Sequence, residues 1–148
     1  RVLLFALCGP LGEGKELSYA RPLALVAIDN PVRPAAKATF EYFRQQGVAV
    51  KVISGDNPVT VGAAALAAGI GGAENSVDAS TLENEEALAA AAKDFTVFGR
   101  VKPDQKRQLI RALQKAGHTV AMTGDGVNDV LALKAADCSI ALKMRDSM

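Results

Sequence analysis

Short apolar runs rich in β-forming residues alternate along this chain with longer segments of helical composition, and this alternation restricts the possible folds most. The apolar runs are residues 23–28, 48–53, 95–98, 119–122 and 138–142. The helical segments between them are residues 35–46, 59–68, 83–92, 104–116 and 127–135. Strands that alternate with helices of about ten to fifteen residues are typical of βαβ units. The pattern therefore predicts an α/β fold with a parallel sheet.

Prolines and glycines mark the ends of the predicted helices. Three prolines stand where helices should begin, a position at which a missing N–H costs nothing: Pro34, Pro58 and Pro103. Three glycines follow helical segments, as expected at helix C-termini: Gly47, Gly69 and Gly117. Residues 11–20 and 69–79 fit neither pattern and are predicted to be loops.

Composition excludes several classes of protein. The chain has 148 residues, of which 49% are hydrophobic and 22% charged, so it can bury a core and is not disordered. Its net charge of +1 gives no electrostatic argument for nucleic acid or a membrane surface as a partner. No apolar run reaches the roughly 20 residues of a membrane helix. Cys8 and Cys138 form no metal-binding pattern, so a reduced, cytosolic setting is expected.

Ser54, Gly55 and Asp56 follow the predicted strand 48–53 directly. Ligands of open parallel sheets bind beyond the carboxyl ends of the strands. A hydroxyl and an unused backbone N–H at that point can hold a phosphate oxygen. An ordinary turn that caps the next helix explains these three residues equally well when they are taken alone.

The segment 119–129 places Asp125, Asn128 and Asp129 at another strand-to-helix turn, with Gly124 and Gly126 on either side of Asp125. Oxygen ligands of this kind suit Mg²⁺, which takes one or two carboxylates together with phosphate oxygens and water. The two acids could also serve only the positive end of the helix dipole. That alternative leaves the two glycines unexplained, so a magnesium site is favoured.

Lys106 lies in the first turn of the predicted helix 104–116, where the helix dipole favours acids over bases. A nearby anion would explain the lysine. A solvated basic face is the better explanation for any single lysine, because Arg107 and Arg111 follow. Taken with the two strand-end segments, however, Lys106 completes a site with a phosphate-binding loop, a cation and a magnesium-binding acid pair.

The order of these segments resembles the haloacid-dehalogenase-like superfamily. The string from Met122 to Asp137, with Gly99-Arg100-Val101 before it, looks like the phosphorylation domain of P-type cation-transporting ATPases. The turn Asp29-Asn30-Pro31-Val32-Arg33 is similar to the segment that follows the nucleotide-binding domain in that family. The resemblance covers about residues 23–142. It implies a Rossmann-like parallel sheet with helices on both faces.

The resemblance also implies roles for individual residues. Ser54 and Gly55 would bind the transferred phosphate, and Lys106 would neutralise its charge. Asp125 would hold Mg²⁺. Asn128 and Asp129 would support phosphate and metal, with Asp129 acting through water.

Three further residues are implied to organise the side of the site that faces the nucleotide-binding domain: Asp56, Asp29 and Arg33. Mg²⁺ and ATP are the cofactors expected of the parent protein. The expected partners are the nucleotide-binding, actuator and membrane domains of that parent. The chain itself is expected to be a soluble fragment at the cytosolic face of a membrane, with no nucleic-acid partner.

Two departures from the family pattern bear on activity. The Asp-Lys-Thr-Gly-Thr segment that carries the nucleophilic aspartate in the family is absent, so the fragment alone is expected to be inactive. Val130 and Leu131 replace the alanine and proline of many members, and residues 143–148 fit the pattern poorly. Residues 1–22 are expected to end the nucleotide-binding domain or form a hinge, and residues 23–148 to form the phosphorylation-domain core.

The missing segment would leave a gap in the sheet between the strand that ends at Ser54 and the strand that ends at Thr123. Three outcomes are open at this point. The two strands could pair directly, the apolar segment 2–7 could fill the gap, or a second copy of the chain could donate a strand.

Two alternative functions remain. The first is a soluble phosphatase of the same superfamily, against which the missing nucleophile argues. The second is a non-catalytic nucleotide-binding module with a Rossmann-like sheet, but no Gly-x-Gly-x-x-Gly turn follows a strand. Phosphate binding that depends on Mg²⁺ would distinguish the ATPase fragment from this module.

Overall fold

The computed structural model describes residues 2–10, 19–28 and 31–142. The chain divides into two compact units, residues 1–31 and 32–148, each of which is described here by itself. The division falls nine residues after the boundary expected at residues 22 and 23. The reason is that the segment after residue 22 continues a strand that belongs to the first unit.

The first unit is an antiparallel hairpin of β1 (Val2–Cys8) and β2 (Ala20–Ala27). The expectation that residues 23–28 join the parallel sheet is therefore wrong. The register shifts between Phe5 and Ala6, opposite the part of β2 that contains Pro22. Proline has no N–H to donate to a neighbouring strand and is tolerated at such irregularities. Most of the predicted loop 11–20 lies outside the described residues, and Ala20 already begins β2.

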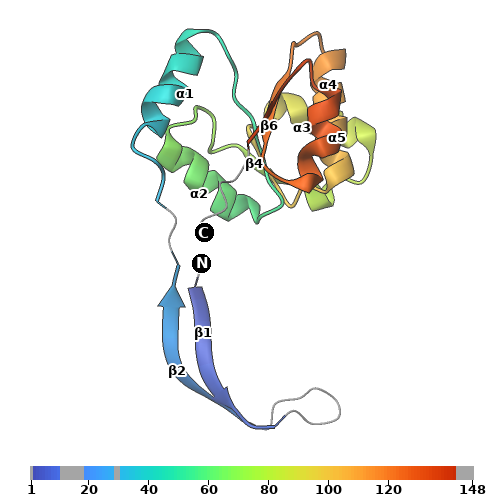
Figure 1. Ribbon diagram of the computed structural model, residues 1–148. Helices are drawn as coiled ribbons and strands as arrows, with labels where there is room; N and C mark the ends of the chain where they lie inside the picture. The colour runs from blue at the N-terminus through green and yellow to red at the C-terminus, as the bar shows by residue number, and fades with distance from the viewer. Residues whose placement is uncertain (1, 11–18, 29–30, 143–148) are drawn as a thin grey trace. The chain divides into compact units, whose positions relative to one another are not determined.

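The second unit alternates helices and strands, as the sequence predicts (Figure 1). Its α-helices are α1 (Ala36–Gln45), α2 (Pro58–Ala68), α3 (Glu85–Asp94), α4 (Pro103–Lys115) and α5 (Val130–Ala135). Its strands are β3 (Val52–Ile53), β4 (Ser76–Asp78), β5 (Val97–Gly99), β6 (Ala121–Gly124) and β7 (Cys138–Ala141). Two 3₁₀ turns complete it: Ala79–Thr81 and Val127–Asp129. The second of these turns replaces the first part of the predicted helix 127–135.

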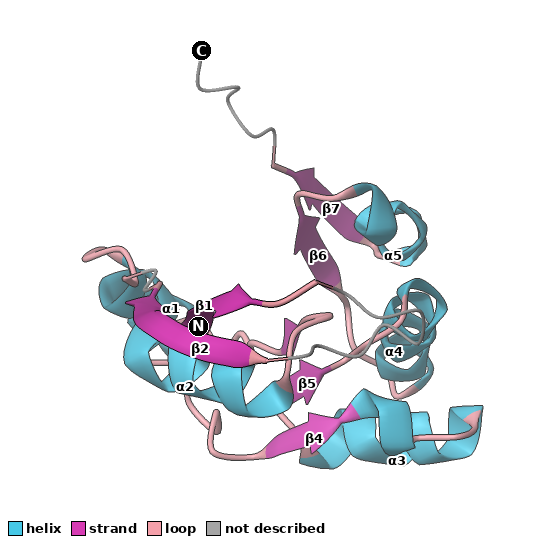
Figure 2. Ribbon diagram, turned by 90° about the horizontal axis from the view of Figure 1, so that it is seen from below, coloured by secondary structure: helices cyan, strands magenta, loops and turns pink. Residues whose placement is uncertain are grey.

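The strands β3, β5 and β4 form a parallel sheet in that order, with helices on both faces. Val97 of the central strand packs with Val61 of α2, whereas Phe98 packs with Leu88 of α3 and Leu109 of α4. Figure 2 shows α2 on one side of β5 and α3 with α4 on the other. Both Val97 and Phe98 are fully buried, which explains why β5 is a continuous apolar run without polar alternation.

Strand β4 lies inside the segment 69–79 that the sequence predicts to be a loop. The strand has only three residues, Ser76, Val77 and Asp78, and Val77 is its single apolar residue. A pattern of period two cannot be recognised over so short a segment. Pairing with β5 decides the conformation of these residues.

The strands β6 and β7 form a second parallel pair, which packs against α4 and α5. Ile110, Met122 and Ala132 are buried together in the core between them. Within the described residues, β3 pairs with β5 and β6 pairs with β7, so direct pairing of β3 with β6 is wrong. The expectation that segment 2–7 fills the gap is also wrong, because β1 pairs only with β2 among the described strands. Donation of a strand by a second copy stays a prediction.

The ends of α2 show how the local sequence sets these elements. The Val59 N–H donates to Asn57 Oδ1 at 2.9 Å, which caps the first turn, and Pro58 begins the helix. Gly69 ends the helix with a φ of 82°, a conformation that glycine adopts without strain. None of the helices in the described part of the chain is both long and apolar enough to cross a membrane.

Candidate functional site

Three segments carry the site: the Ser54 loop (residues 54–56), the Arg100 turn (residues 99–101) and the Asp125 loop (residues 123–129). The Ser54 loop follows β3 and is bound to the Arg100 turn through the backbone. Ser54 N–H donates to the Phe98 carbonyl at 2.9 Å, and Val101 N–H donates to the Ser54 carbonyl at 3.0 Å. Arg100 N–H donates to the Asp56 carbonyl at 2.8 Å. The end of β3 is thus held against the residues that lead into α4.

The Ser54 loop retains donors that suit an anion. The Ser54 Oγ accepts a hydrogen bond from the Asp56 N–H at 3.2 Å, so the hydroxyl proton is left to donate elsewhere. Gly55 is exposed, and its N–H has no hydrogen-bond partner among the described residues. A hydroxyl and an unused amide beside each other are the donors that the sequence predicts for a phosphate oxygen.

An ion pair joins α4 to the Asp125 loop. Lys106 Nζ lies 2.6 Å from Asp129 Oδ1, and the two side chains are only 12% and 10% exposed. Asp129 Oδ2 also accepts the Gly126 N–H at 3.4 Å. Burial raises the pKa of Asp129, but the Lys106 ammonium and the backbone N–H groups of Gly126 and Asp125 lower it more, and the net pKa lies below its ordinary value. Asp129 is therefore ionised at neutral pH.

Gly124 allows Asp129 to fold back onto the end of β6. A Cβ on Gly124 would lie 2.7 Å from the Cβ of Asp129 and 2.8 Å from its Oδ2. Real Cβ atoms do not approach one another this closely, so any side chain at residue 124 would displace Asp129. Residue 124 must therefore be a glycine because Asp129 packs against it. The sequence alone does not reveal this requirement.

Asp125 and Asn128 are exposed. Within the described residues, the Asp125 carboxylate takes part in no hydrogen bond or ion pair, whereas the Asp129 carboxylate is occupied by Lys106. No group of three or more His, Cys, Asp or Glu side chains in the described residues is placed to hold a metal. The donor set still fits Mg²⁺, which binds through one or two carboxylates and takes its other ligands from phosphate and water.

The structure thus joins Lys106 to Asp129 and the Ser54 loop to the Arg100 turn. Arg33 is exposed, and its carbonyl accepts the Ala36 N–H at 2.9 Å at the start of α1. Asp29 lies outside the described residues. The hinge roles of Arg33, Asp56 and Asp29 stay predictions.

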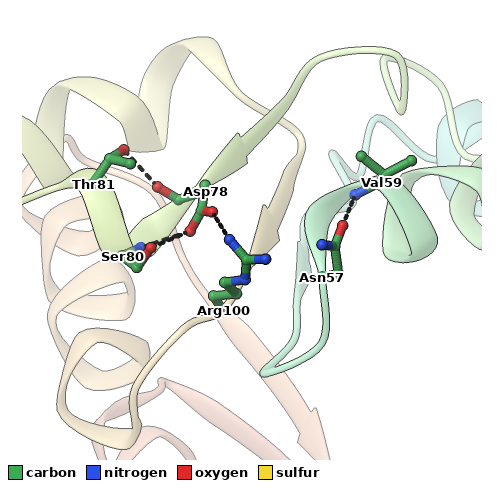
Figure 3. Close-up of polar contacts among 6 residues, drawn as sticks. All are labelled: Asn57, Val59, Asp78, Ser80, Thr81 and Arg100. Carbon is green, nitrogen blue, oxygen red and sulfur yellow. Dashed lines mark hydrogen bonds and ion pairs between the residues drawn. The ribbon is translucent and has the colours of Figure 1, made fainter. Parts of the chain in front are cut away.

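Asp78 contacts the Arg100 turn, although the sequence pattern did not indicate it as a site residue. Arg100 Nη1 lies 2.6 Å from Asp78 Oδ2, and Asp78 Oδ1 accepts both the N–H and the hydroxyl of Ser80 (Figure 3). The Ser80 hydroxyl lowers the pKa of Asp78 against the opposing effect of burial, and the Ser80 amide and Arg100 lower it further. No sequence signal could identify the pair, because Asp78 and Arg100 are 22 residues apart.

Comparison with known proteins is consistent with this geometry. The model of the haloacid dehalogenase-like hydrolase family matches residues 6–137. The chain is 52% identical, over 99% of its length, to the probable cation-transporting ATPase exp7 of Streptococcus pneumoniae, and covers 19% of that protein. It is 56% identical, over 96% of its length, to the calcium-transporting ATPase CtpE of Mycobacterium bovis, and covers 18% of it.

A solved structure is also similar. The catalytic domain of the CPx-ATPase CopB-B matches with a TM-score of 0.56 and 26% sequence identity, over 83% of this chain and 40% of that one. The resemblance to the phosphorylation domain of cation-transporting ATPases is confirmed, as is the α/β fold class. The chain spans about a fifth of the length of the curated relatives that it matches.

Proposed function

Because this chain belongs to the haloacid dehalogenase-like hydrolase family, we propose that it is the phosphorylation-domain part of a P-type ATPase that transports a cation. The observation that carries the proposal is the nearly buried pair of Lys106 and Asp129, whose aspartate shares a loop with the exposed Asp125. Phosphoryl transfer needs positive charge beside the phosphoryl oxygens. The Lys106 ammonium provides that charge, and the exposed carboxylate of Asp125 is available to bind a metal ion.

Each residue has one task in this proposal. Ser54 Oγ–H and Gly55 N–H bind oxygens of the phosphoryl group, and Lys106 neutralises part of its charge. Asp129 holds the Lys106 ammonium in place. Asp125 and Asn128 bind and orient the metal and phosphate, and bound Mg²⁺ would supply further neutralisation of phosphoryl charge.

The acceptor of the phosphoryl group is proposed to be an aspartate from another part of the parent protein, which would form an aspartyl-phosphate. ATP would be the donor, and the nucleotide-binding, actuator and membrane domains would be the partners at the cytosolic face of a membrane. Ca²⁺ is the proposed cargo, because the similar protein of Mycobacterium bovis is named a calcium-transporting ATPase.

The test uses the full-length parent ATPase with Asp125→Asn. This change keeps the size of the side chain but removes the charge that would bind Mg²⁺, so phosphoenzyme formation from labelled ATP is expected to be abolished. Asp104→Asn is the matched control, because Asp104 is an exposed acid in the first turn of α4. Phosphoenzyme in Asp125→Asn at the level of the control would contradict the proposal.

A second experiment tests the expected inactivity of the isolated chain. The 148-residue chain is incubated with Mg²⁺ and labelled ATP, and acid-stable label that is sensitive to hydroxylamine is measured. No label is expected, because the family's nucleophile segment is absent from the sequence. Stoichiometric labelling would instead identify one of the chain's own aspartates as the nucleophile and favour a phosphatase.

A further inference from the structure

Arg100 has the left-handed backbone conformation, with a φ of 51°, and is the one non-glycine residue of the described part of the chain with a positive φ. This conformation brings the Cβ of an L-residue too close to its own backbone. Such a residue persists only where the surrounding contacts require it, and these residues concentrate at functional sites. The contacts of Arg100 therefore indicate which part of the structure requires its strained conformation.

The left-handed bend directs two consecutive amides at the Ser54 loop. Arg100 N–H donates to the Asp56 carbonyl and Val101 N–H to the Ser54 carbonyl, at 2.8 and 3.0 Å. These two carbonyls lie on either side of Gly55 in the sequence. The Arg100 turn thus fixes the Ser54–Gly55 peptide group directly and also holds the Asp56–Asn57 peptide group one residue further on.

Fixing the Ser54 carbonyl also fixes the direction of the Gly55 N–H. The two belong to one planar trans peptide group, in which C=O and N–H point in opposite directions. Because the carbonyl points at Val101, the Gly55 N–H points away from the Arg100 turn. This exposed amide has no hydrogen-bond partner among the described residues.

The Arg100 side chain holds the turn in place. Its Nη1 lies 2.6 Å from Asp78 Oδ2 at the end of β4. Asp78 is itself fixed, because its Oδ1 accepts the Ser80 N–H at 3.0 Å and the Ser80 hydroxyl at 2.6 Å. Figure 3 shows Arg100 and Ser80 reaching the same carboxylate. Asp78 thus connects the Arg100 turn to the neighbouring strand.

We propose that Arg100, anchored by Asp78, is a positioning residue that directs the Gly55 amide at the phosphoryl group. The inference rests on the proposed function, since it names what sets the geometry of the same phosphate-binding loop. Arg100 acts here through the backbone of its turn and does not touch the phosphoryl group.

Orthovanadate binding to the full-length parent ATPase tests the proposal, because vanadate is a phosphate analogue that needs no nucleotide. Arg100→Ala is expected to raise the vanadate concentration for half-maximal inhibition about tenfold, less than the loss of a whole oxyanion donor. Asp78→Asn is expected to raise it by a similar factor, and the double variant no further, because both act through one contact. Arg44→Ala, which removes an ion pair of the same 2.6 Å length with Glu41 on α1, is the control and should change nothing.

The Asp78 variant distinguishes positioning from direct contact. If Arg100 bound the anion itself, Asp78→Asn would release the guanidinium and vanadate affinity would stay the same or rise, which would overturn the proposal. Unchanged affinity in Arg100→Ala would also overturn it. Arg100→Lys keeps a cation for Asp78 and should recover most of the affinity, which keeps the test valid if Arg100→Ala folds poorly. Failure of the wild-type ATPase to bind vanadate or form a phosphoenzyme would reject the proposed function as well.

Discussion

The Ser54 loop and the Asp125 loop lie at the ends of parallel strands and carry the two halves of the candidate site, but they are held by different forces. Backbone hydrogen bonds from the Arg100 turn fix the Ser54 loop, and no charged group takes part in those bonds. The Asp125 loop is fixed by the ion pair of Lys106 with Asp129, whose side chains are nearly buried. The Ser54 half therefore depends directly on backbone hydrogen bonds, with the exposed Arg100–Asp78 pair behind them, whereas the Asp125 half depends on a nearly buried ion pair.

This difference has a physical consequence for each half. Neutral backbone hydrogen bonds do not titrate over the pH range in which proteins fold, and they fail only when the backbone moves. A nearly buried ion pair is sensitive to the loss of either partner, because the remaining charge is left without compensation. The same comparison predicts which changes should damage each loop.

Lys106→Met is expected to have the largest effect on stability. The variant keeps an unbranched side chain of similar length but leaves the Asp129 carboxylate nearly buried and without its cation. The free energy of unfolding should fall by about 3 kcal/mol. Urea unfolding of the chain followed by far-UV circular dichroism measures this fall. Lys102→Met, at the exposed start of α4, is the control, and equal stability of the two variants would contradict the importance of the ion pair.

Gly99→Val tests the half that depends on backbone geometry. A Cβ at residue 99 would lie 2.4 Å from the Pro58 N and 2.5 Å from the Pro58 Cα, so the backbone after the Ser54 loop must move. The expected loss is about 2 kcal/mol, typical of an overpacked site. Gly71→Val is the matched control, because a Cβ there meets nothing within 4 Å. A melting temperature of Gly99→Val equal to that of the control would argue against this close contact.

The dependence of stability on pH should arise partly from Asp129. Its pKa is lowered in the folded state, so it stabilises the fold fully above its unfolded pKa of about 3.9. That stabilisation is lost as the pH falls from this value through the folded pKa. Asp129→Asn should therefore lose less stability than the wild type between about pH 5 and pH 2 in urea titrations. If the free energies of unfolding of the two proteins changed in parallel with pH, the pKa of Asp129 would not be lowered in the folded state.

Arg100→Gly is expected to change stability least. Glycine adopts a positive φ without the penalty of about 1 kcal/mol that an L-residue carries, and this gain offsets the loss of an exposed ion pair. Arg100→Ala loses the same pair and keeps the penalty, so it should be about 1 kcal/mol less stable than Arg100→Gly. Equal urea midpoints for these two variants would mean that residue 100 is not left-handed in solution.

Most helices and strands of the second unit could be predicted from interactions between residues that are close together in the sequence. Pro58 and Gly69 sit at the ends of α2 as expected, and the apolar run that contains Val97 and Phe98 forms a strand. The strand ends that carry Ser54 and Asp125 were also predicted, because glycine and polar residues after an apolar run mark the end of a strand. The proposed catalytic roles of these residues stay predictions.

The sequence misled where pairing between strands decided the outcome. The segment 23–28 has the composition of a core strand, but it lies in β2, which pairs with β1 in an antiparallel hairpin. Both strands of that hairpin are apolar yet exposed, with Phe5 at 63% and Leu25 at 72%, whereas Phe98 on β5 is fully buried. Apolar composition gives the tendency to form a strand but not its neighbour, which depends on residues far away in the chain.

The sequence by itself determined the α/β alternation, the helix ends and the polar residues that follow the strands. All of these depend on interactions within a few residues, such as the Asn57 cap of α2. Only the tertiary structure decided that Lys106 pairs with Asp129 and that Arg100 pairs with Asp78. These partners are 23 and 22 residues apart and meet because separate strands and helices pack together. The left-handed conformation of Arg100 follows from the same packing, because its amide and side chain bind segments that local sequence cannot bring near.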